Sequence, residues 1–405
     1  MRRAVTLIAA LLFSFVAAFA QTDRLGYSVS GKVVDASSGR PIESVNVTVP
    51  GSQHATVTNA DGEFVIKSRT PIKTVSFSML GYRSVRESVG DGPIKVLMVR
   101  IYIPLDEASI VSGNPYTILR TALDRRRDTY CTSPELLECF YRETVRKHSR
   151  YTYVAEAVAR LYKYTFDGTV MRDDAAVEKS RVLISQRKRD TLSVVMQGGP
   201  TQALTHDILK NNDIMFGDED FRLYSFTMAN PEYIGDRLQF VIEFEPGWMA
   251  DYALYRGRIF IDRELLTFTR IEASLDMENE AKVIRMLLVK KPSGLRFHPR
   301  EASIVINYRL VEGRSRLEYF RTTTVFDCDW KKRLFKTRYT VVNELVVTDT
   351  REPAVPIPRS ERFRIKDALG DRAEEFLDPD FWIDYNIIEP SESLEHATGR
   401  LRKGR

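Results

Sequence analysis

Short apolar runs that alternate with polar positions fill two parts of the chain. The first part, residues 29–105, contains "VSGKVVD", "ESVNVTVPG", "HATVTNADGEFVIKS", "KTVSFSMLGYRS" and "IKVLMVRI". Val45, Val47 and Val49 alternate with polar neighbours there, as in a strand with one buried face. Strand-length runs of this kind, separated by turn residues, predict a small antiparallel β-sandwich.

The second part, from Arg222 to Val347, has eight further strand-like runs joined by turn clusters. They are "RLYSFTMAN", "RLQFVIEFEP", "YRGRIFID", "LTFTRIEASLD", "AKVIRMLLVKK", "EASIVINYRL", "SRLEYFRTTTVF" and "FKTRYTVVNELVV". Strands in series with short links predict one large antiparallel sheet, which can curl into a half-barrel. The run "VIRMLLV" at 283–289 is apolar at almost every position, which predicts a strand buried on both faces.

Helical patterns lie between these two parts. Asn114 and Pro115 suit the start of a helix whose apolar face holds Ile118, Leu119, Ala122 and Leu123. A second helix is predicted for "TSPELLECFYRETV" at 132–145, and a short third one within "TQALTHDILKNN" at 201–212. The fold class is therefore mainly β, with a sandwich followed by an α+β domain in which a few helices cover the large sheet.

The end of the sheet is marked by Pro353, Pro356 and Pro358. Beyond them, "DPDFWIDYNIIEP" at 378–390 is predicted to be a strap that docks on the sheet through Phe381, Trp382 and Tyr385. The strap is one expected partner for the apolar run 283–289, and a groove for an acyl chain or an apolar peptide is the other. The basic tail at 391–405 is expected to be a frayed, solvated end.

The first residues, "MRRAVTLIAALLFSFVAAFAQTD", have the three parts of a secretory signal. Arg2 and Arg3 are followed by an apolar stretch, and Ala18-Phe19-Ala20 forms a cleavage site before Gln21. We expect residues 1–20 to be removed, the mature chain to carry no membrane span, and the protein to be exported to the periplasm or the outer membrane.

Composition adds two constraints. The net charge of +5 falls to +3 when Arg2 and Arg3 leave with the signal, too balanced for a nucleic-acid partner. Three cysteines, Cys131, Cys139 and Cys328, allow one disulfide in an oxidising compartment and leave at least one thiol free. Neither they nor the scattered histidines have the spacing of zinc ligands.

The segment "VTNADGEFVI" at 57–66 has the residues of either a calcium loop or a turn. With Gly62 at the sixth position of a calcium loop, the first and twelfth positions hold Val57 and Ser68, which are not the required ligands. A turn accounts for Asn59, Asp61 and Gly62, because the two polar side chains can bond nearby amides and glycine adopts the left-handed conformation. Gly81 and Tyr82 are expected to form a second structural turn.

The residues around these turns resemble a known family. "GKVVDASSGRPIESVNVTV", "TVTNADGEFVI" and "SMLGYRS" are similar to the carboxypeptidase-like regulatory domain over roughly residues 29–112. The resemblance implies a transthyretin-like, carbohydrate-binding-like sandwich without catalytic activity. It also implies an exported context, since the domain occurs at the N-terminus of exported proteins and outer-membrane receptors of Gram-negative bacteria.

The rest of the chain has weaker resemblances. "FYRETV", "EAVARLY", "GGPTQAL", "GRIFID" and "FWIDYNIIEP" are similar to segments of exported proteins of unknown function that carry the regulatory domain in front. The hairpin "YRGRIFIDRELLTFTRIEASL" also resembles those of periplasmic half-barrel lipoprotein carriers.

Catalytic motifs are few. His298 and Glu301 in "HPRE", with His396 later, have the spacing of zinc-carboxypeptidase ligands, but the chain ends too soon after His396 for a downstream catalytic glutamate. A Gly-x-Ser-x-Gly elbow and a glycine-rich phosphate loop are absent from the sequence. We therefore predict no catalytic residues, no metal and no cofactor.

One set of charged residues beside aromatic ones is the candidate ligand site. Its members are Tyr141, Arg142, Glu143, Glu156, Arg187 and Lys188. These side chains could line a binding cleft, or they could be ordinary ion pairs of the scaffold, and the sequence leaves both interpretations open.

These observations predict a domain at 27–112, a second at 114–390 and a non-enzymatic, exported envelope protein that binds a partner or an extended ligand. One alternative is a carbohydrate-binding accessory protein of an uptake system, which would need exposed aromatic residues on the sandwich such as Tyr27, Phe77 or Tyr82. Another is a hydrolase whose site has no recognisable motif.

Overall fold

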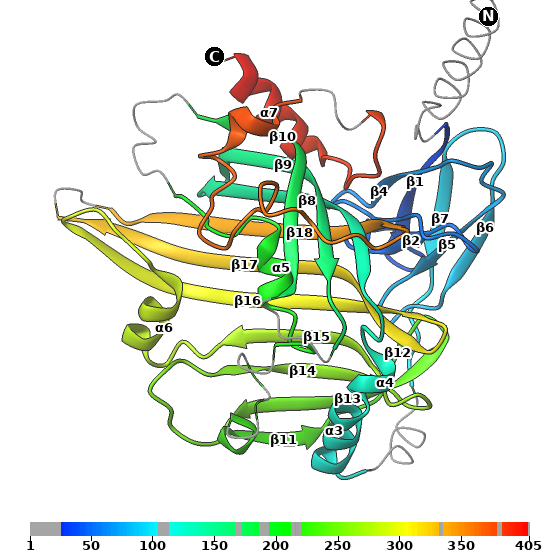
Figure 1. Ribbon diagram of the computed structural model, residues 1–405, viewed down its shortest axis with the longest axis horizontal. Coiled ribbons are helices and arrows are strands. Elements are labelled where there is room, and N and C mark those ends of the chain that lie inside the picture. Colours follow the sequence, from blue (N-terminus) through cyan, green and yellow to red (C-terminus); the bar gives the residue numbers. More distant parts are fainter. Residues whose placement is uncertain are drawn as a thin grey trace, which may run out of the picture.

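The computed structural model describes most of the chain after the predicted signal. The described residues are 26–103, 113–166, 172–185, 194–211, 215, 217, 220–331, 335–378 and 383–403. Two bodies of β structure make up these residues, a small sandwich and one large sheet (Figure 1).

The sandwich consists of two sheets. One has the order β4-β1-β7, from Glu63–Ser68, Tyr27–Asp35 and Ile94–Met98, and the other has the order β3-β2-β5-β6, from Ala55–Val57, Asn46–Thr48, Thr74–Ser78 and Val85–Ser88. Every pair is antiparallel except β1 with β7, which is parallel. The expected alternation holds, since Val45 and Val47 are buried and meet Phe64 and Phe77 in the core between the sheets.

The large sheet has eleven strands in the order β10-β9-β8-β18-β17-β16-β15-β14-β13-β11, with β12 also paired to β13. The strands are β8 Glu135–Lys147, β9 Arg150–Lys163, β10 Asp174–Ile184, β11 Tyr224–Met228, β12 Glu232–Ile234, β13 Arg237–Pro246, β14 Tyr255–Asp262, β15 Phe268–Leu275, β16 Leu295–Val311, β17 Arg314–Trp330 and β18 Thr337–Arg351. Neighbouring strands are antiparallel throughout, and the edge strands β10 and β11 are not paired with each other. The predicted fold class, mainly β with a large antiparallel sheet, is confirmed.

The helices are short. They are α3 Pro115–Asp124, α4 Arg126–Thr129, α5 Thr201–Thr205, α6 Glu280–Leu287 and α7 Glu392–Lys403, with 3₁₀ turns η3 Asp220–Leu223 and η4 Ala373–Phe376. The helix predicted after Asn114 is confirmed as α3, and the Asn114 side chain accepts from the amides of Tyr116 and Thr117. None of the described helices is long and apolar enough to cross a membrane.

The second predicted helix, at 132–145, is wrong, because these residues form the central strand β8. Leu136, Leu137 and Phe140 have helical spacing, but β8 lies between β9 and β18 and is buried on both faces. A strand covered on both sides shows no alternation of apolar and polar residues, so its pattern does not distinguish it from a buried helix.

The apolar run 283–289 is also corrected. Seven of the eight predicted strand runs are strands, but "VIRMLLV" lies in α6 and the residues after it. Val283 is its buried residue, whereas Met286 and Val289 are exposed. Residues 283–289 are therefore not a strand that the strap or a ligand must cover on both faces, as the sequence had suggested. The third predicted helix is present but short, since α5 ends at Thr205.

The two faces of the large sheet are covered differently. On the helix-covered face, residues of α3, α5 and the segment up to Phe221 pack against Leu137, Ile271 and Ile306 of the sheet. On the opposite, sandwich-covered face, Val57 of β3 packs with Phe140 of β8 and with Ile388 near the C-terminus. Figure 1 shows the sandwich beside one end of the large sheet and α6 at the other end.

The C-terminal segment joins the two bodies. β18 ends at Arg351, just before the predicted prolines, and residues 383–391 then run between the sandwich and the large sheet. Phe381 and Trp382, the predicted anchors of the strap, lie outside the described residues, while Tyr385 is half-buried near Phe140. The tail expected to be frayed is instead helix α7, whose Leu394 and Leu401 pack on Val154 and Leu183.

Candidate functional site

The predicted ligand residues are divided between the two faces of the sheet. Tyr141 and Glu143 point into the helix-covered face, and Arg142 and Glu156 point to the sandwich-covered face. Adjacent residues of a strand lie on opposite faces, so Arg142 is separated from Tyr141 and Glu143 in the strand Glu135–Lys147. Arg187 and Lys188 lie outside the described residues.

Arg142 and Glu156 form a buried ion pair beneath the C-terminal segment. The Arg142 guanidinium donates to Glu156 Oε1 at 2.8 Å and to the main-chain oxygen of Ile388 at 2.6 Å. Arg181 also pairs with Glu156. Burial alone would raise the pKa of Glu156, but the two guanidiniums hold it below its usual value. The Arg142 guanidinium thus ties the C-terminal segment to the large sheet through Ile388.

Glu143 has an unusual environment on the other face. Its carboxyl accepts hydrogen bonds from the hydroxyls of Tyr141, at 2.8 Å, and Tyr153, and its side chain has no ion pair with a cation in the described structure. Burial raises the pKa of Glu143 to about 7, although the two hydroxyl bonds act in the opposite direction. Glu143 is therefore a carboxyl group that changes charge near neutral pH inside the protein.

A cavity of about 130 Å³ lies next to this group. We call it the Tyr153 pocket, because Tyr153 lines it and also bonds to Glu143. Its lining comes from the end of β8, the start of β9, the end of β10 and two loops, namely Val145, Thr152, Tyr153, Ile184, Ser185, Val194, Val195, Met196, Ala368, Gly370 and Asp371. Apart from Tyr153, Asp371 and two hydroxyl side chains, the lining side chains are apolar.

Sequence reasoning missed the Tyr153 pocket because its residues come from five separate segments. Tyr153 is adjacent to the motif "EAVARLY", yet nothing in the sequence places it against Gly370 or Met196. Gly370 itself makes room for the ring, since a Cβ there would lie 3.1 Å from the Tyr153 hydroxyl oxygen. The close approach of these two residues is a tertiary feature.

Two buried lysine–aspartate pairs occupy the helix-covered face. Lys163 pairs with Asp207, whose carboxylate also accepts from the hydroxyls of Tyr130 and Tyr308, and Lys210 pairs with Asp173. Burial alone would lower the pKa of Lys163, but Asp207 raises it. These contacts tie the covering segments to the sheet.

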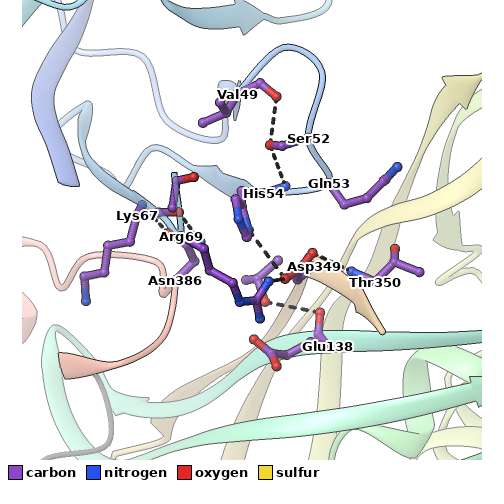
Figure 2. A network of polar contacts seen from close by, with 12 residues as sticks. Val49, Ser52, Gln53, His54, Lys67, Arg69, Glu138, Asp349, Thr350 and Asn386 are labelled. Atoms are coloured by element: carbon purple, nitrogen blue, oxygen red, sulfur yellow. Dashed lines mark hydrogen bonds and ion pairs between the residues drawn. The ribbon is translucent and has the colours of Figure 1, made fainter. Parts of the chain in front are cut away.

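A third polar network joins the sandwich to the large sheet, as Figure 2 shows. Asp349 of β18 accepts from Arg69 at 2.7 Å, and its carboxylate lies 3.5 Å from Nδ1 of His54. Asn386 exchanges two hydrogen bonds with the main chain of Lys67, at 2.6 and 3.0 Å. Burial lowers the pKa of His54, with Asp349 opposing the effect.

The residues expected to be structural turns have turn geometry. Asn59 Oδ1 accepts from the amides of Asp61 and Glu63 at 2.9 and 2.8 Å, and Gly62 has φ +73°. The same turn contacts the C-terminal segment, because Asp61 accepts from the amide of Glu392 at 2.7 Å. Gly81 has φ +76°, and the Tyr82 hydroxyl donates to Asp35 at 3.0 Å.

The described residues do not assemble a metal site. No group of three or more histidine, cysteine or acidic side chains among them could hold a metal ion. His298 on β16 bonds to Glu280 rather than to the exposed Glu301, and His396 lies on α7. Cys131, Cys139 and Cys328 are buried and free.

Comparison with known proteins identifies the first domain. Residues 29–110 match the family model of the CarboxypepD_reg-like domain, in agreement with the resemblance found in the sequence. The match covers the sandwich and does not extend into the large sheet. A comparison with curated proteins finds no matching relative.

Solved structures are similar to this chain only at low levels. An outer membrane lipoprotein-sorting protein domain from Vibrio parahaemolyticus is 10% identical, with TM-score 0.26, over 61% of this chain and 96% of that one. A DUF1329 family protein from Desulfovibrio piger is 11% identical, with TM-score 0.25, over 61% and 97%. A membrane-associated protein of unknown function from Bacteroides fragilis is 8% identical, with TM-score 0.15, over 80% and 98%. At such TM-scores these structures carry no information about a ligand of this chain.

Proposed function

We propose that this chain is an exported, non-catalytic binding protein of the cell envelope that holds the end of an acyl chain in the Tyr153 pocket. The observation that carries the proposal is the cavity of about 130 Å³, whose lining includes apolar side chains such as Val145, Ile184 and Met196. An engineered cavity of about 150 Å³ with apolar walls binds benzene, so a volume of this order is sufficient for a short apolar group. The rest of an extended ligand would lie outside the cavity.

The polar groups of the pocket favour a ligand that has an apolar end followed by a polar group. The Tyr153 hydroxyl donates to Glu143. Asp371, Thr152 and Ser185 supply the other polar groups of the lining. Ligand sites are typically apolar with a few polar groups that fix orientation, and this lining has that composition.

A non-catalytic role fits the position of Glu143. A carboxyl with a pKa near 7 is often a general acid or base, so Glu143 is the natural candidate for catalysis. Both of its oxygens are occupied by tyrosine hydroxyls, and it is not among the lining residues of the cavity. Tyr153 therefore lies between the carboxyl and any ligand. The regulatory domain and the predicted signal support export.

Most of the aromatic residues that the carbohydrate alternative requires on the sandwich surface are buried. Of the aromatic residues on which it depended, Phe77 and Tyr82 are buried in or against the sandwich core, and only Tyr27 is exposed. A sugar-binding face stacks its ligand on exposed rings, and besides Tyr27 the exposed Tyr102 after β7 could serve in this way.

Fluorescence titration with a dansyl-labelled fatty acid tests the proposal. We expect saturable binding by the native chain and at least a tenfold weaker affinity in Met196→Trp, because the larger side chain fills the cavity. The matched control is Val99→Trp, at an exposed apolar position of the sandwich, and it should bind as the native chain does. Equal affinity in both variants, or displacement of the probe by an apolar peptide and not by unlabelled fatty acid, would contradict the proposal.

A further inference from the structure

The topology of the large sheet separates its connections into two groups. Because consecutive strands from β13 to β18 are antiparallel neighbours, their connections alternate between the two ends of the sheet. Residues 247–254, 276–294 and 331–336 connect strands at one end, which we call the hairpin end. Residues 263–267 and 312–313 connect strands at the other. Figure 1 shows α6, which belongs to the hairpin end, far from the sandwich.

Large apolar side chains are exposed at the hairpin end. Trp248 is 73% exposed, Met249 94%, Val289 84% and Phe335 83%, and they come from all three connections. The opposite end differs, because no large apolar residue in 263–267 or 312–313 is among the exposed ones. Scattered exposed apolar residues are normal on a protein, but a concentration on one end of one sheet needs a reason.

The three connections are held together by specific contacts. α6 bonds to residues 247–254 through Lys282, which donates to the main-chain oxygen of Ala250, and through Arg285, which donates to that of Asp251 at 3.1 Å. On its other side, Leu288 packs in one cluster with Trp330 at the end of β17. The hairpin end is therefore one continuous surface built on the sheet.

Exposed lysines accompany the apolar residues. Lys290 and Lys291 follow Val289 directly, and Lys331 and Lys336 are close to Phe335 in the sequence. Two neighbouring acidic residues form ion pairs within the chain, Glu280 with His298 and Asp276 with Arg256. These pairs offset part of the negative charge near the hairpin end. The surface combines aromatic and aliphatic side chains with positive charge.

We infer that the hairpin end docks on the anionic surface of a lipid bilayer. Tryptophan and phenylalanine partition into the boundary between headgroups and acyl chains, and lysines bind the headgroup phosphates. A protein partner accounts for the composition less well, because lysine is depleted in protein–protein interfaces. The inference goes beyond the proposed ligand pocket and does not depend on it, although Val145 and Thr152 place the pocket at this same end of the sheet.

Sedimentation with vesicles of phosphatidylglycerol or phosphatidylcholine tests the inference on the chain from Gln21 onward. We expect binding to phosphatidylglycerol vesicles with a blue shift of Trp248 fluorescence, and at least tenfold weaker binding to phosphatidylcholine. The variant Trp248→Asp with Met249→Asp should lose at least tenfold in vesicle affinity. Each of Lys290→Gln and Lys291→Gln should weaken it by about fivefold.

The matched control changes Leu97 and Val99 to Asp, two exposed apolar residues of the sandwich. This variant should bind vesicles as the native chain does. Absence of vesicle binding by the native chain, or equal loss in the control, would overturn the inference. So would self-association that Trp248→Asp abolishes in the absence of vesicle binding. Weak binding of the dansyl-labelled fatty acid would leave these results unchanged, which separates the two proposals.

Discussion

Arg69 of the sandwich and Asp349 of the large sheet form an ion pair, with 2.7 Å between the guanidinium Nη1 and the carboxylate Oδ2. Asp349 is buried, whereas the Arg69 side chain is 43% exposed. The pair crosses the contact between the two bodies of the protein, and His54 adds a second group from the sandwich to the same carboxylate (Figure 2). The contact between the domains is thus specified by charge as well as by apolar packing.

We expect Asp349→Asn to weaken this contact. Loss of the charge removes the ion pair and leaves Arg69 to the solvent, so the free energy of unfolding should fall by about 1–2 kcal/mol. Chemical denaturation followed by circular dichroism measures the change. Asp91→Asn, at an exposed position of the sandwich, is the control and should have no effect. An unchanged denaturation midpoint in Asp349→Asn would show that the ion pair does not stabilise the docked arrangement.

The raised pKa of Glu143 predicts that the stability of the protein depends on pH. Burial raises its pKa from 4.5 in the unfolded chain to about 7 in the folded protein, so the folded state binds the proton more tightly. The resulting stabilisation is fully present below about pH 4.5 and is lost as the pH rises through 7, with a total of about 3 kcal/mol.

The variant Glu143→Gln isolates this contribution. Its amide stays neutral at every pH. Between pH 4.5 and pH 8 the native chain should therefore lose about 3 kcal/mol of unfolding free energy relative to the variant. Urea denaturation at a series of pH values measures the difference. Parallel pH profiles for the two proteins would mean that the pKa of Glu143 is the same in the folded and unfolded states.

The sandwich should fold without the rest of the chain. Residues 27–112 contain their own core around Val33, Val47, Phe64 and Phe77, so the isolated fragment should melt cooperatively. It should melt at a lower temperature than the sandwich within the full chain, because contacts such as that of Val57 with Ile388 are missing. A disordered fragment would show that the domain depends on the large sheet for its fold.

The mature chain should begin at Gln21. A signal peptidase that cuts after Ala18-Phe19-Ala20 would remove both N-terminal arginines and the apolar stretch. Intact-mass measurement of protein extracted from the envelope checks this prediction. A mass that includes Met1 to Ala20 would contradict the argument for export by this route.

The amino-acid sequence by itself was sufficient for features that depend on local patterns. The alternation around Val45 and Val47 predicted the sandwich, Asn114 with Pro115 predicted the start of α3, and Pro353 predicted the end of the sheet. Each of these depends on residues within a few positions of one another. Seven of the eight predicted strand runs of the large sheet followed from the same kind of pattern.

The tertiary structure alone decided the rest. β8 and the run around Met286 were assigned to the wrong element. β8 is buried on both faces and shows no alternation, and the run is apolar even at the exposed positions Met286 and Val289. The neighbours of Glu143 could not be predicted either, since Tyr153 reaches it through the pairing of β8 with β9. Apolar composition does not say whether a side chain is buried or exposed, and for Val289 and Trp248 only the packing of α6 on the sheet settles that.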